Sequence, residues 1–157
     1  MFTGTNIALI GAFCAVAFAG LGSAKGVGLV GQAADGLLSE DPNKFGKVLI
    51  LEALPGTQGI YGLITAFLVI IKLGILGNPV ACSKEDGLYL LVACLPIAVV
   101  GYFSAIHQGK VAAAGVSLVA KREEELGKAI TNAALVETYA IFAVLVSLLL
   151  VAFKTIG

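Results

Sequence analysis

Four long apolar segments, separated by short polar turns, make up nearly the whole chain. They cover approximately residues 7–38, 45–76, 87–120 and 126–153. A helix needs about 20 apolar residues to cross the hydrocarbon core of a bilayer, so the pattern predicts four membrane-spanning helices, the first of them long enough to protrude. Residues 1–6 contain no Lys or Arg, whereas a cleaved signal peptide begins with a positive region. We therefore expect the first segment to be retained as a span.

The two halves of the chain resemble each other, as a search for internal repeats reveals. Residues 46–47 match 127–128, residues 54–61 align with 135–142 without a gap, and residues 24–27 match 109–112 once the first loop is allowed four extra residues. The sequence therefore predicts an all-α membrane protein built as a duplicated helical hairpin, with both copies in the same orientation. In this alignment Glu137 falls on Gly56, so only one copy carries the acid.

The repeat also predicts the domain organisation and the topology. We expect a first hairpin over residues 1–76, a connecting loop over 77–86 and a second hairpin over 87–157. Basic residues flank the first and third turns, namely Lys44, Lys47, Lys121, Arg122 and Lys128. The positive-inside rule then places these two turns in the cytoplasm and both termini outside the cell membrane.

Composition supports a membrane protein and excludes other classes. The chain is 59% hydrophobic and 13% charged, whereas soluble proteins carry about 25% charged residues. It shows no basic patch for nucleic acid, and its cysteines, Cys14, Cys82 and Cys94, lack the spacing of a metal site. Residues 26–31 match G-x-G-x-x-G, but this dinucleotide fingerprint requires a preceding strand, so we expect no nucleotide site.

Glu137 is an acid near the middle of the last segment. If Lys128 marks the start of this helix, a rise of about 1.5 Å per residue puts Glu137 about 13 Å deep, close to the centre of a core about 30 Å thick. Placing a carboxylate there costs about 2.5 kcal/mol or more. One interpretation is a neutral acid paired inside a bundle, and the other is a site that carries an ion or a proton. Glu52 lies only about 7 Å by helical rise beyond Lys47, so we expect it to be peripheral.

Oxygen-bearing side chains interrupt the second and third segments. They are Thr57, Gln58 and Tyr61 in the second and Ser104 and Gln108 in the third. Pro55 lacks an N–H, which loosens the helix and frees a carbonyl about one turn earlier. These groups could simply hold helices together. With Glu137, however, the set offers the Thr57 hydroxyl, two amide oxygens, a carbonyl and a carboxylate, which are the ligands of a hard cation, whereas a proton carrier needs only the acid.

Small residues distinguish the first and third segments from the other two. Gly and Ala recur along residues 20–31 and 105–115, whereas the second and fourth segments carry bulkier Leu, Ile, Val and Phe. Small residues allow close helix packing in lipid. The pattern fits packing within one four-helix bundle, and it also fits a crowded inner ring of many subunits with a lipid-facing outer wall.

The motifs described above resemble the duplicated proteolipid, or K subunit, of bacterial V-type ATPases, particularly of the sodium-translocating kind. The resemblance covers essentially the whole chain and is carried by residues 22–28, 54–59, 108–115 and 136–140. It implies a homo-oligomeric rotor ring that cytoplasmic ATP hydrolysis turns through a central-stalk subunit, beside a stator membrane subunit with an arginine. The chain would be non-catalytic itself and would carry the ion.

The resemblance also implies a ligand set for Na⁺ as the transported ion. It comprises the Leu54 carbonyl, Thr57, Gln58, Gln108 and Glu137, with a supporting hydrogen bond from Tyr61 to the carboxylate. His107 departs from the family pattern and has no assigned role. The alternatives are the same rotor coupled to H⁺, a small four-helix secondary transporter, and a purely structural membrane protein.

Overall fold

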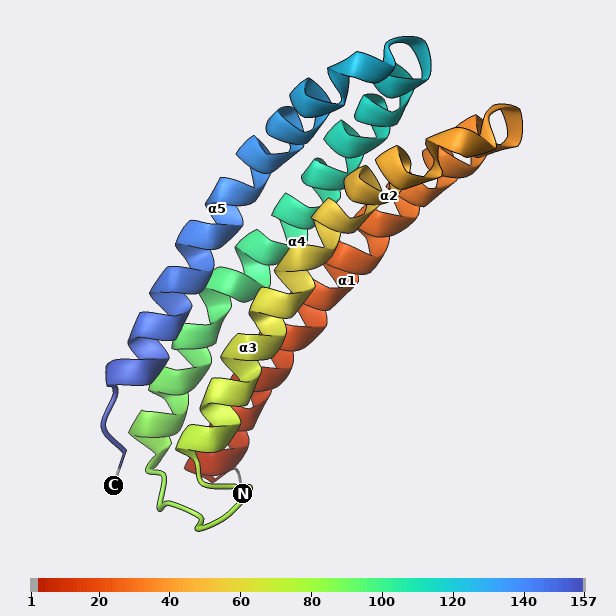
Figure 1. Cartoon of the computed structure of the whole chain (residues 1–157). Helices are drawn as coiled ribbons and strands as arrows, with labels where there is room; N and C mark the ends of the chain where they lie inside the picture. Colours follow the sequence, from red (N-terminus) through yellow and green to blue (C-terminus); the bar gives the residue numbers. More distant parts are fainter. Residues whose placement is uncertain (1–2, 157) are drawn as a thin grey trace.

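The chain folds into four long helical rods that run the length of the molecule (Figure 1). The computed structural model describes residues 3–156, so residues 1–2 and 157, at the ends of the predicted hairpins, lie outside it. The helices are α1 Gly4–Glu40, α2 Phe45–Ala53, α3 Thr57–Lys72, α4 Lys84–Lys121 and α5 Leu126–Phe153, with 3-10 turns η1 Pro42–Lys44, η2 Leu54–Gly56 and η3 Glu123–Glu125. The second rod comprises α2, η2 and α3. All four rods are long and apolar enough to cross a membrane, which confirms the predicted all-α class.

Local capping explains where the ends of two rods differ from the prediction. The α4 helix begins earlier than expected because Ser83 Oγ accepts the backbone N–H of Asp86 at 3.1 Å, the usual arrangement at a helix N-cap. The α3 helix ends earlier than expected, at Lys72, because Gly74 two residues later has a left-handed φ of 66°. The loop between the hairpins therefore spans residues 73–83 instead of 77–86.

The turns of the two hairpins have the same length and shape. Asp41 ends α1 at φ −139° and ψ 89°, and Arg122, 81 positions later, ends α4 at φ −142° and ψ 89°. The next helices begin at Phe45 and Leu126, again 81 positions apart. The expected four-residue difference between the first and third turns is therefore wrong. Four residues are close to one helical turn of about 3.6, so the shifted alignment still matched small residues on the same face.

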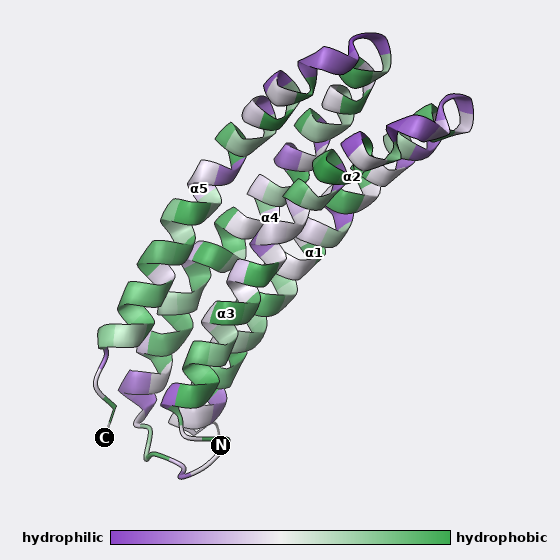
Figure 2. Cartoon of the chain, in the orientation of Figure 1, coloured by the Kyte–Doolittle hydropathy of each residue, from purple (hydrophilic) through white to green (hydrophobic). Residues whose placement is uncertain are grey.

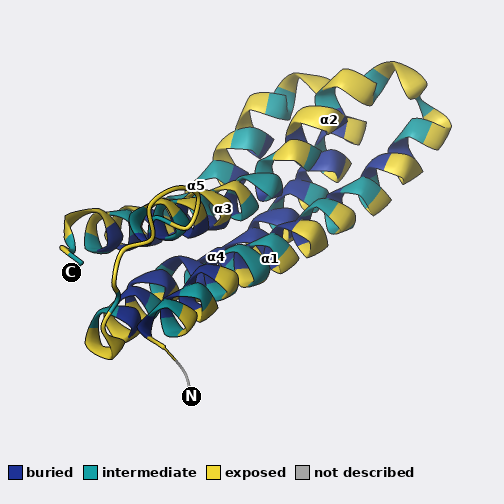
Figure 3. Cartoon of the chain, turned by 90° about the horizontal axis from the view of Figure 1, so that it is seen from below, coloured by how far each residue is buried: buried dark blue, intermediate teal, exposed yellow. Residues whose placement is uncertain are grey.

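The α1 and α4 helices lie side by side in the same direction, and they form one layer, with α3 and α5 in the other (Figures 1 and 3). Glycines let the first two backbones approach closely. A Cβ atom on Gly109 would lie 2.5 Å from the Cα of Gly26, and one on Gly22 would lie 2.6 Å from the Cα of Tyr102. Close approach at small residues is typical of helix pairs in membranes. The Gly-rich segments of the two repeats therefore pack against each other within one chain.

Hydrophobic residues predominate along much of the rods, and hydrophilic residues gather at their ends (Figure 2). The two hairpin turns lie at one end, and the termini and the 73–83 loop lie at the other (Figure 1). Large apolar side chains such as Phe13 and Phe142 are more than half exposed, at 64% and 62%. A surface of this kind suits contact with lipid or with other membrane helices.

Candidate ion-binding site

The second rod changes its helical geometry beside Pro55, and the first residues of the candidate site lie at this change. Pro55 lies in η2, where the helix tightens into a 3-10 turn before α3 begins at Thr57. The carbonyl oxygen of Leu54 accepts both the backbone N–H of Thr57 and its hydroxyl, the latter at 3.0 Å. The proline thus places a carbonyl and a hydroxyl next to each other near the middle of the rod.

Three oxygen atoms of this segment gather around a single hydroxyl proton. Thr57 Oγ1 lies 3.0 Å from the Leu54 carbonyl oxygen and 3.3 Å from Gln58 Oε1. A hydroxyl has one proton, so it can be donated to only one of the two acceptors. The cluster is therefore rich in lone pairs, and a cation would stabilise it.

The other repeat supplies the acid. Tyr61 Oη donates to Glu137 Oε1 at 2.6 Å, and Gln108 Nε2 donates to Glu137 Oε2 at 3.3 Å. Gln58 Nε2 in turn donates to Gln108 Oε1 at 2.5 Å. Gln58 and Gln108 are fully buried, and Glu137 and Tyr61 are partly buried. The structure thus brings every site residue named from the sequence into one chain of contacts across η2, α3, α4 and α5.

The charge of Glu137 has no ionic partner within the described part of the chain. The ion pairs there lie near helix ends, for example Lys47 with Glu123 and Lys154 with Asp86. A carboxylate at the depth of the apolar rods must therefore be neutralised by a bound cation or by a proton.

Two buried serines support the site; the sequence singled out Ser104 only as an oxygen-bearing side chain near Gln108, and it gave no role to Ser23. Ser104 Oγ donates to the carbonyl of Val136 at 3.0 Å and lies 3.4 Å from Gln58 Nε2. Ser23 Oγ accepts the backbone N–H of Gly59 at 2.8 Å, in the first turn of α3. The offset of 81 residues makes the two serines counterparts, so a gapless alignment of the repeats is the signal that would have paired them.

The corresponding position between α1 and the second rod lacks the acid and the amide. The offset pairs Gly56 with Glu137 and Val27 with Gln108. A Cβ on Gly56 would lie 3.8 Å from Cγ2 of Val27, so these two residues meet as Gln108 and Glu137 do. Within residues 3–156, the acid and the amide therefore meet between α4 and α5, and a glycine and a valine take their places between the second rod and α1.

Two other candidates lie apart from these contacts. Glu52 is packed beside α1, where its Oε1 would lie 3.0 Å from a Cβ on Gly31. His107 is exposed and lines a groove of about 320 Å³ together with Tyr139. Neither contacts Glu137 through a hydrogen bond in the described part of the chain.

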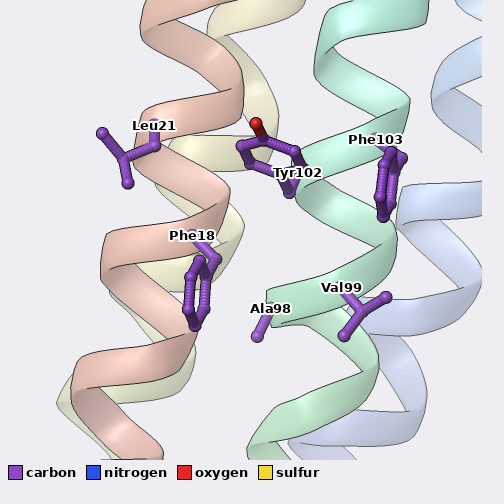
Figure 4. Close-up of a pocket in the computed structure, with 6 residues that line it drawn as sticks. All are labelled: Phe18, Leu21, Ala98, Val99, Tyr102 and Phe103. Atoms are coloured by element: carbon purple, nitrogen blue, oxygen red, sulfur yellow. The ribbon is translucent and has the colours of Figure 1, made fainter.

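An apolar groove of about 370 Å³ lies between α1 and α4, on the face turned away from α3 and α5 (Figure 4). Phe18 and Leu21 of α1 and Val99 and Phe103 of α4 line it. It contains none of the oxygen-bearing side chains around Glu137, so its chemistry suits an acyl chain or another helix instead of an ion.

Comparison with known proteins identifies the family. Residues 10–69 and residues 91–150 each match the family of the ATP synthase C subunit. The chain belongs to this family. Its two matched stretches start 81 positions apart, in agreement with the hairpin turns, and they confirm the predicted duplication. As a family member, the protein is a non-catalytic membrane rotor subunit of a rotary ATPase.

Two relatives show which kind of subunit within the family the chain resembles. The chain is 51% identical to the V-type sodium ATPase subunit K of Enterococcus hirae, over 94% of this chain and 92% of that relative. It is 39% identical to the A-type ATP synthase subunit K of Methanocaldococcus jannaschii, over 90% of this chain and 60% of that relative. The chain therefore resembles subunit K proteins along almost its entire length.

Proposed function

We propose that the protein carries Na⁺ across the membrane, and that it does so at Glu137 within a rotor ring of identical subunits. The observation that supports this most directly is a cluster of neutral oxygens at Leu54, Thr57 and Gln58 that is joined to one carboxylate through the Gln58–Gln108–Glu137 hydrogen bonds. Carboxylate and carbonyl oxygens are preferred ligands of hard cations. The relative that is 51% identical over the aligned residues is named as a sodium ATPase subunit, which is consistent with this ion.

In this proposal each site group has a defined role. The ligands are the Leu54 carbonyl, Thr57 Oγ1, the amide oxygens of Gln58 and Gln108, and the carboxylate of Glu137, which are all within the contacts described above. Tyr61 holds one carboxylate oxygen through its hydroxyl. The carboxylate neutralises the ion, and the neutral oxygens replace its water.

Rotation would couple this site to ATP hydrolysis. While a protomer faces lipid, bound Na⁺ keeps Glu137 neutral, because a bare carboxylate in hydrocarbon is unfavourable. At the stator membrane subunit, an arginine would attract the carboxylate and release the ion. A central-stalk subunit would turn the ring. In the ring, α1 and α4 would form the inner layer, and the second rod and α5 the outer wall.

The distribution of charge supports one orientation. Basic side chains at the hairpin turns include Lys44, Lys47, Lys121 and Lys128. By the positive-inside rule this end would face the cytoplasm, and the termini and the 73–83 loop would face the outside of the cell. The central-stalk subunit, driven by ATP hydrolysis, would then turn the ring from the end that carries the hairpin turns.

Carbodiimide labelling of Glu137 tests the choice of ion. The reagent reacts with the protonated carboxyl group, so Na⁺ that binds there should slow the reaction, and more Na⁺ should be needed at lower pH. Thr57→Ala and Gln58→Ala should weaken this protection while leaving the carboxyl reactive. Thr138→Ala is a matched control. Thr138 is the counterpart of Thr57 in the other repeat and also donates to a carbonyl three residues earlier, at 2.7 Å, but that carbonyl belongs to Leu135, which is not a proposed ligand. If millimolar Na⁺ failed to protect at any pH, the rotor would be assigned to H⁺.

A further inference from the structure

Ser104 connects two elements that carry proposed ligands. It is buried in α4, with 6% of its surface exposed. Its Oγ lies 3.0 Å from the carbonyl oxygen of Val136, the residue before Glu137 on α5, and 3.4 Å from Nε2 of Gln58 on α3. One hydroxyl therefore touches both the backbone beside the acid and the amide of a ligand, and the proposed ligand set does not include it.

The hydrogen bonds of Ser104 have a fixed direction. A serine hydroxyl has one proton and two lone pairs. The Val136 carbonyl has no proton to donate, so the Ser104 proton must lie on that side. The lone pairs of Ser104 then face Gln58, and only an N–H of the Gln58 amide can be accepted there.

This direction determines which way the Gln58 amide is turned. Its NH₂ group lies between two acceptors, Ser104 Oγ and Gln108 Oε1. Its oxygen is consequently turned toward Thr57 Oγ1, at 3.3 Å. If the amide rotated by half a turn, its oxygen would face the Ser104 lone pairs and its NH₂ would face the ligand cluster. An N–H directed at the cluster repels a cation.

We propose that Ser104 is a positioning residue for ion selectivity: it holds the Gln58 amide with its oxygen toward the cation position and thereby favours Na⁺ over H⁺. This inference rests on the proposed function of the site. Protonation of Glu137 does not use the Gln58 oxygen, so loss of the Ser104 hydroxyl should weaken Na⁺ binding and leave proton binding unchanged. A residue that only stabilised the fold would not separate the two ions in this way.

The experiment measures both ions at Glu137 in the purified, assembled ring. The Na⁺ concentration for half-maximal protection from carbodiimide is measured at a fixed pH, and the pH of half-maximal labelling is measured without Na⁺. Ser104→Ala removes the hydroxyl. Ser147→Ala is the matched control, because Ser147 is also buried at the α4–α5 interface, where it accepts the N–H of Ile97 at 3.3 Å.

We expect Ser104→Ala to raise the Na⁺ concentration for half-maximal protection by about three- to tenfold, the range of one neutral hydrogen bond. The pH of half-maximal labelling should stay at the wild-type value, and Ser147→Ala should change neither quantity. Should Ser104→Ala fail to assemble, Ser104→Thr and Ser104→Val are compared instead, because these two side chains have nearly equal volume and only Thr has a hydroxyl. We expect Ser104→Thr to bind Na⁺ nearly as the wild type does and Ser104→Val to bind it more weakly.

Two results would overturn the inference, and they differ from failure of the proposed function. Equal Na⁺ protection in the wild type, Ser104→Ala and Ser104→Val would show that the hydroxyl does not set selectivity. An equal change in Na⁺ and proton binding would show that the role is structural. If the wild type itself showed no protection by Na⁺, the proposed ion would be wrong, and the inference about Ser104 would end with it.

Discussion

Gln58 of the first repeat and Gln108 of the second are joined by a hydrogen bond of 2.5 Å, and both side chains are fully buried. The candidate site therefore lies between the repeats and belongs to neither alone. Gln58 and Tyr61 come from the first hairpin, and Gln108 and Glu137 from the second. Duplication of the hairpin allowed the two copies to diverge, so that one acid is served by groups from both.

Glu137→Gln should leave a folded, assembled ring and reduce Na⁺ transport and coupled ATP hydrolysis to background. Glutamine keeps the size of the side chain and one acceptor oxygen, but its NH₂ group donates where the second carboxylate oxygen accepts, and it has no charge to balance the ion. Transport by reconstituted vesicles and ring assembly on a native gel are the measurements. Glu52→Gln is the control, because Glu52 lies beside Gly31 and outside the site contacts, and it should transport normally. Wild-type transport by Glu137→Gln would rule out the rotor site.

Tyr61→Phe should weaken Na⁺ binding without abolishing it. The lost bond is the 2.6 Å contact with Glu137 Oε1, and a hydrogen bond to a charged group has a value of about 1.5–3 kcal/mol. Since Tyr61 is only partly buried, we expect the low end of this range, or about a tenfold higher Na⁺ concentration for half-maximal carbodiimide protection. Tyr139→Phe, on the exposed side of α5, is the control and should resemble the wild type. No change in Tyr61→Phe would mean that this bond does not serve the ion.

Gly109→Ala should destabilise the protomer by about 1–3 kcal/mol, the usual cost of overpacking. Its Cβ would lie 2.5 Å from the Cα of Gly26, and backbone cannot move aside as a flexible side chain can. The measurement is thermal unfolding of the purified protein. Gly127→Ala is the matched control, because no atom lies within 4 Å of a Cβ there. Equal unfolding temperatures for the two variants would contradict the close α1–α4 contact.

The orientation can be measured by cysteine labelling with a membrane-impermeant maleimide. A cysteine at Glu124, in η3, should react only from the cytoplasmic side, and the natural Cys82, in the 73–83 loop, should react only from outside. Intact cells and inverted vesicles expose opposite sides, so the two sites should exchange their labelling between the preparations. The reverse assignment would show that the basic residues at the turns do not set the topology.

The same labelling should depend on pH at Cys82. Burial raises the pKa of the Cys82 thiol, and the carboxylate of Asp86 raises it further, while Lys154 opposes them. The thiolate is the reactive form, so Cys82 should react more slowly at neutral pH than an ordinary thiol and should speed up as the pH rises. Asp86→Asn should lower the pKa and increase the rate at a fixed pH. The rate is best measured with Cys14 and Cys94 replaced by alanine. A slower reaction in Asp86→Asn would reverse the assigned direction.

The sequence by itself determined the helices and named the residues of the candidate site. Apolar runs long enough to cross the bilayer predict spanning helices, because backbone groups in lipid must form hydrogen bonds within the segment. An acid such as Glu137 in the last of these runs indicates a candidate functional position, because burying its charge is costly. Periodicity along a helix also indicated that Thr57 and Tyr61 share a face.

Tertiary structure decided the register of the repeats and the direction of the hydrogen bonds. Residues four apart on a helix lie on nearly the same face. Residue types alone therefore could not distinguish the true offset of 81 from an offset of 85. The matching turns at Asp41 and Arg122 distinguish them. The role proposed for Ser104 depends on atoms of Gln58 and Val136 that lie far apart in the sequence, at 46 and 32 positions from it. Only the packing of α3, α4 and α5 brings them within hydrogen-bonding distance.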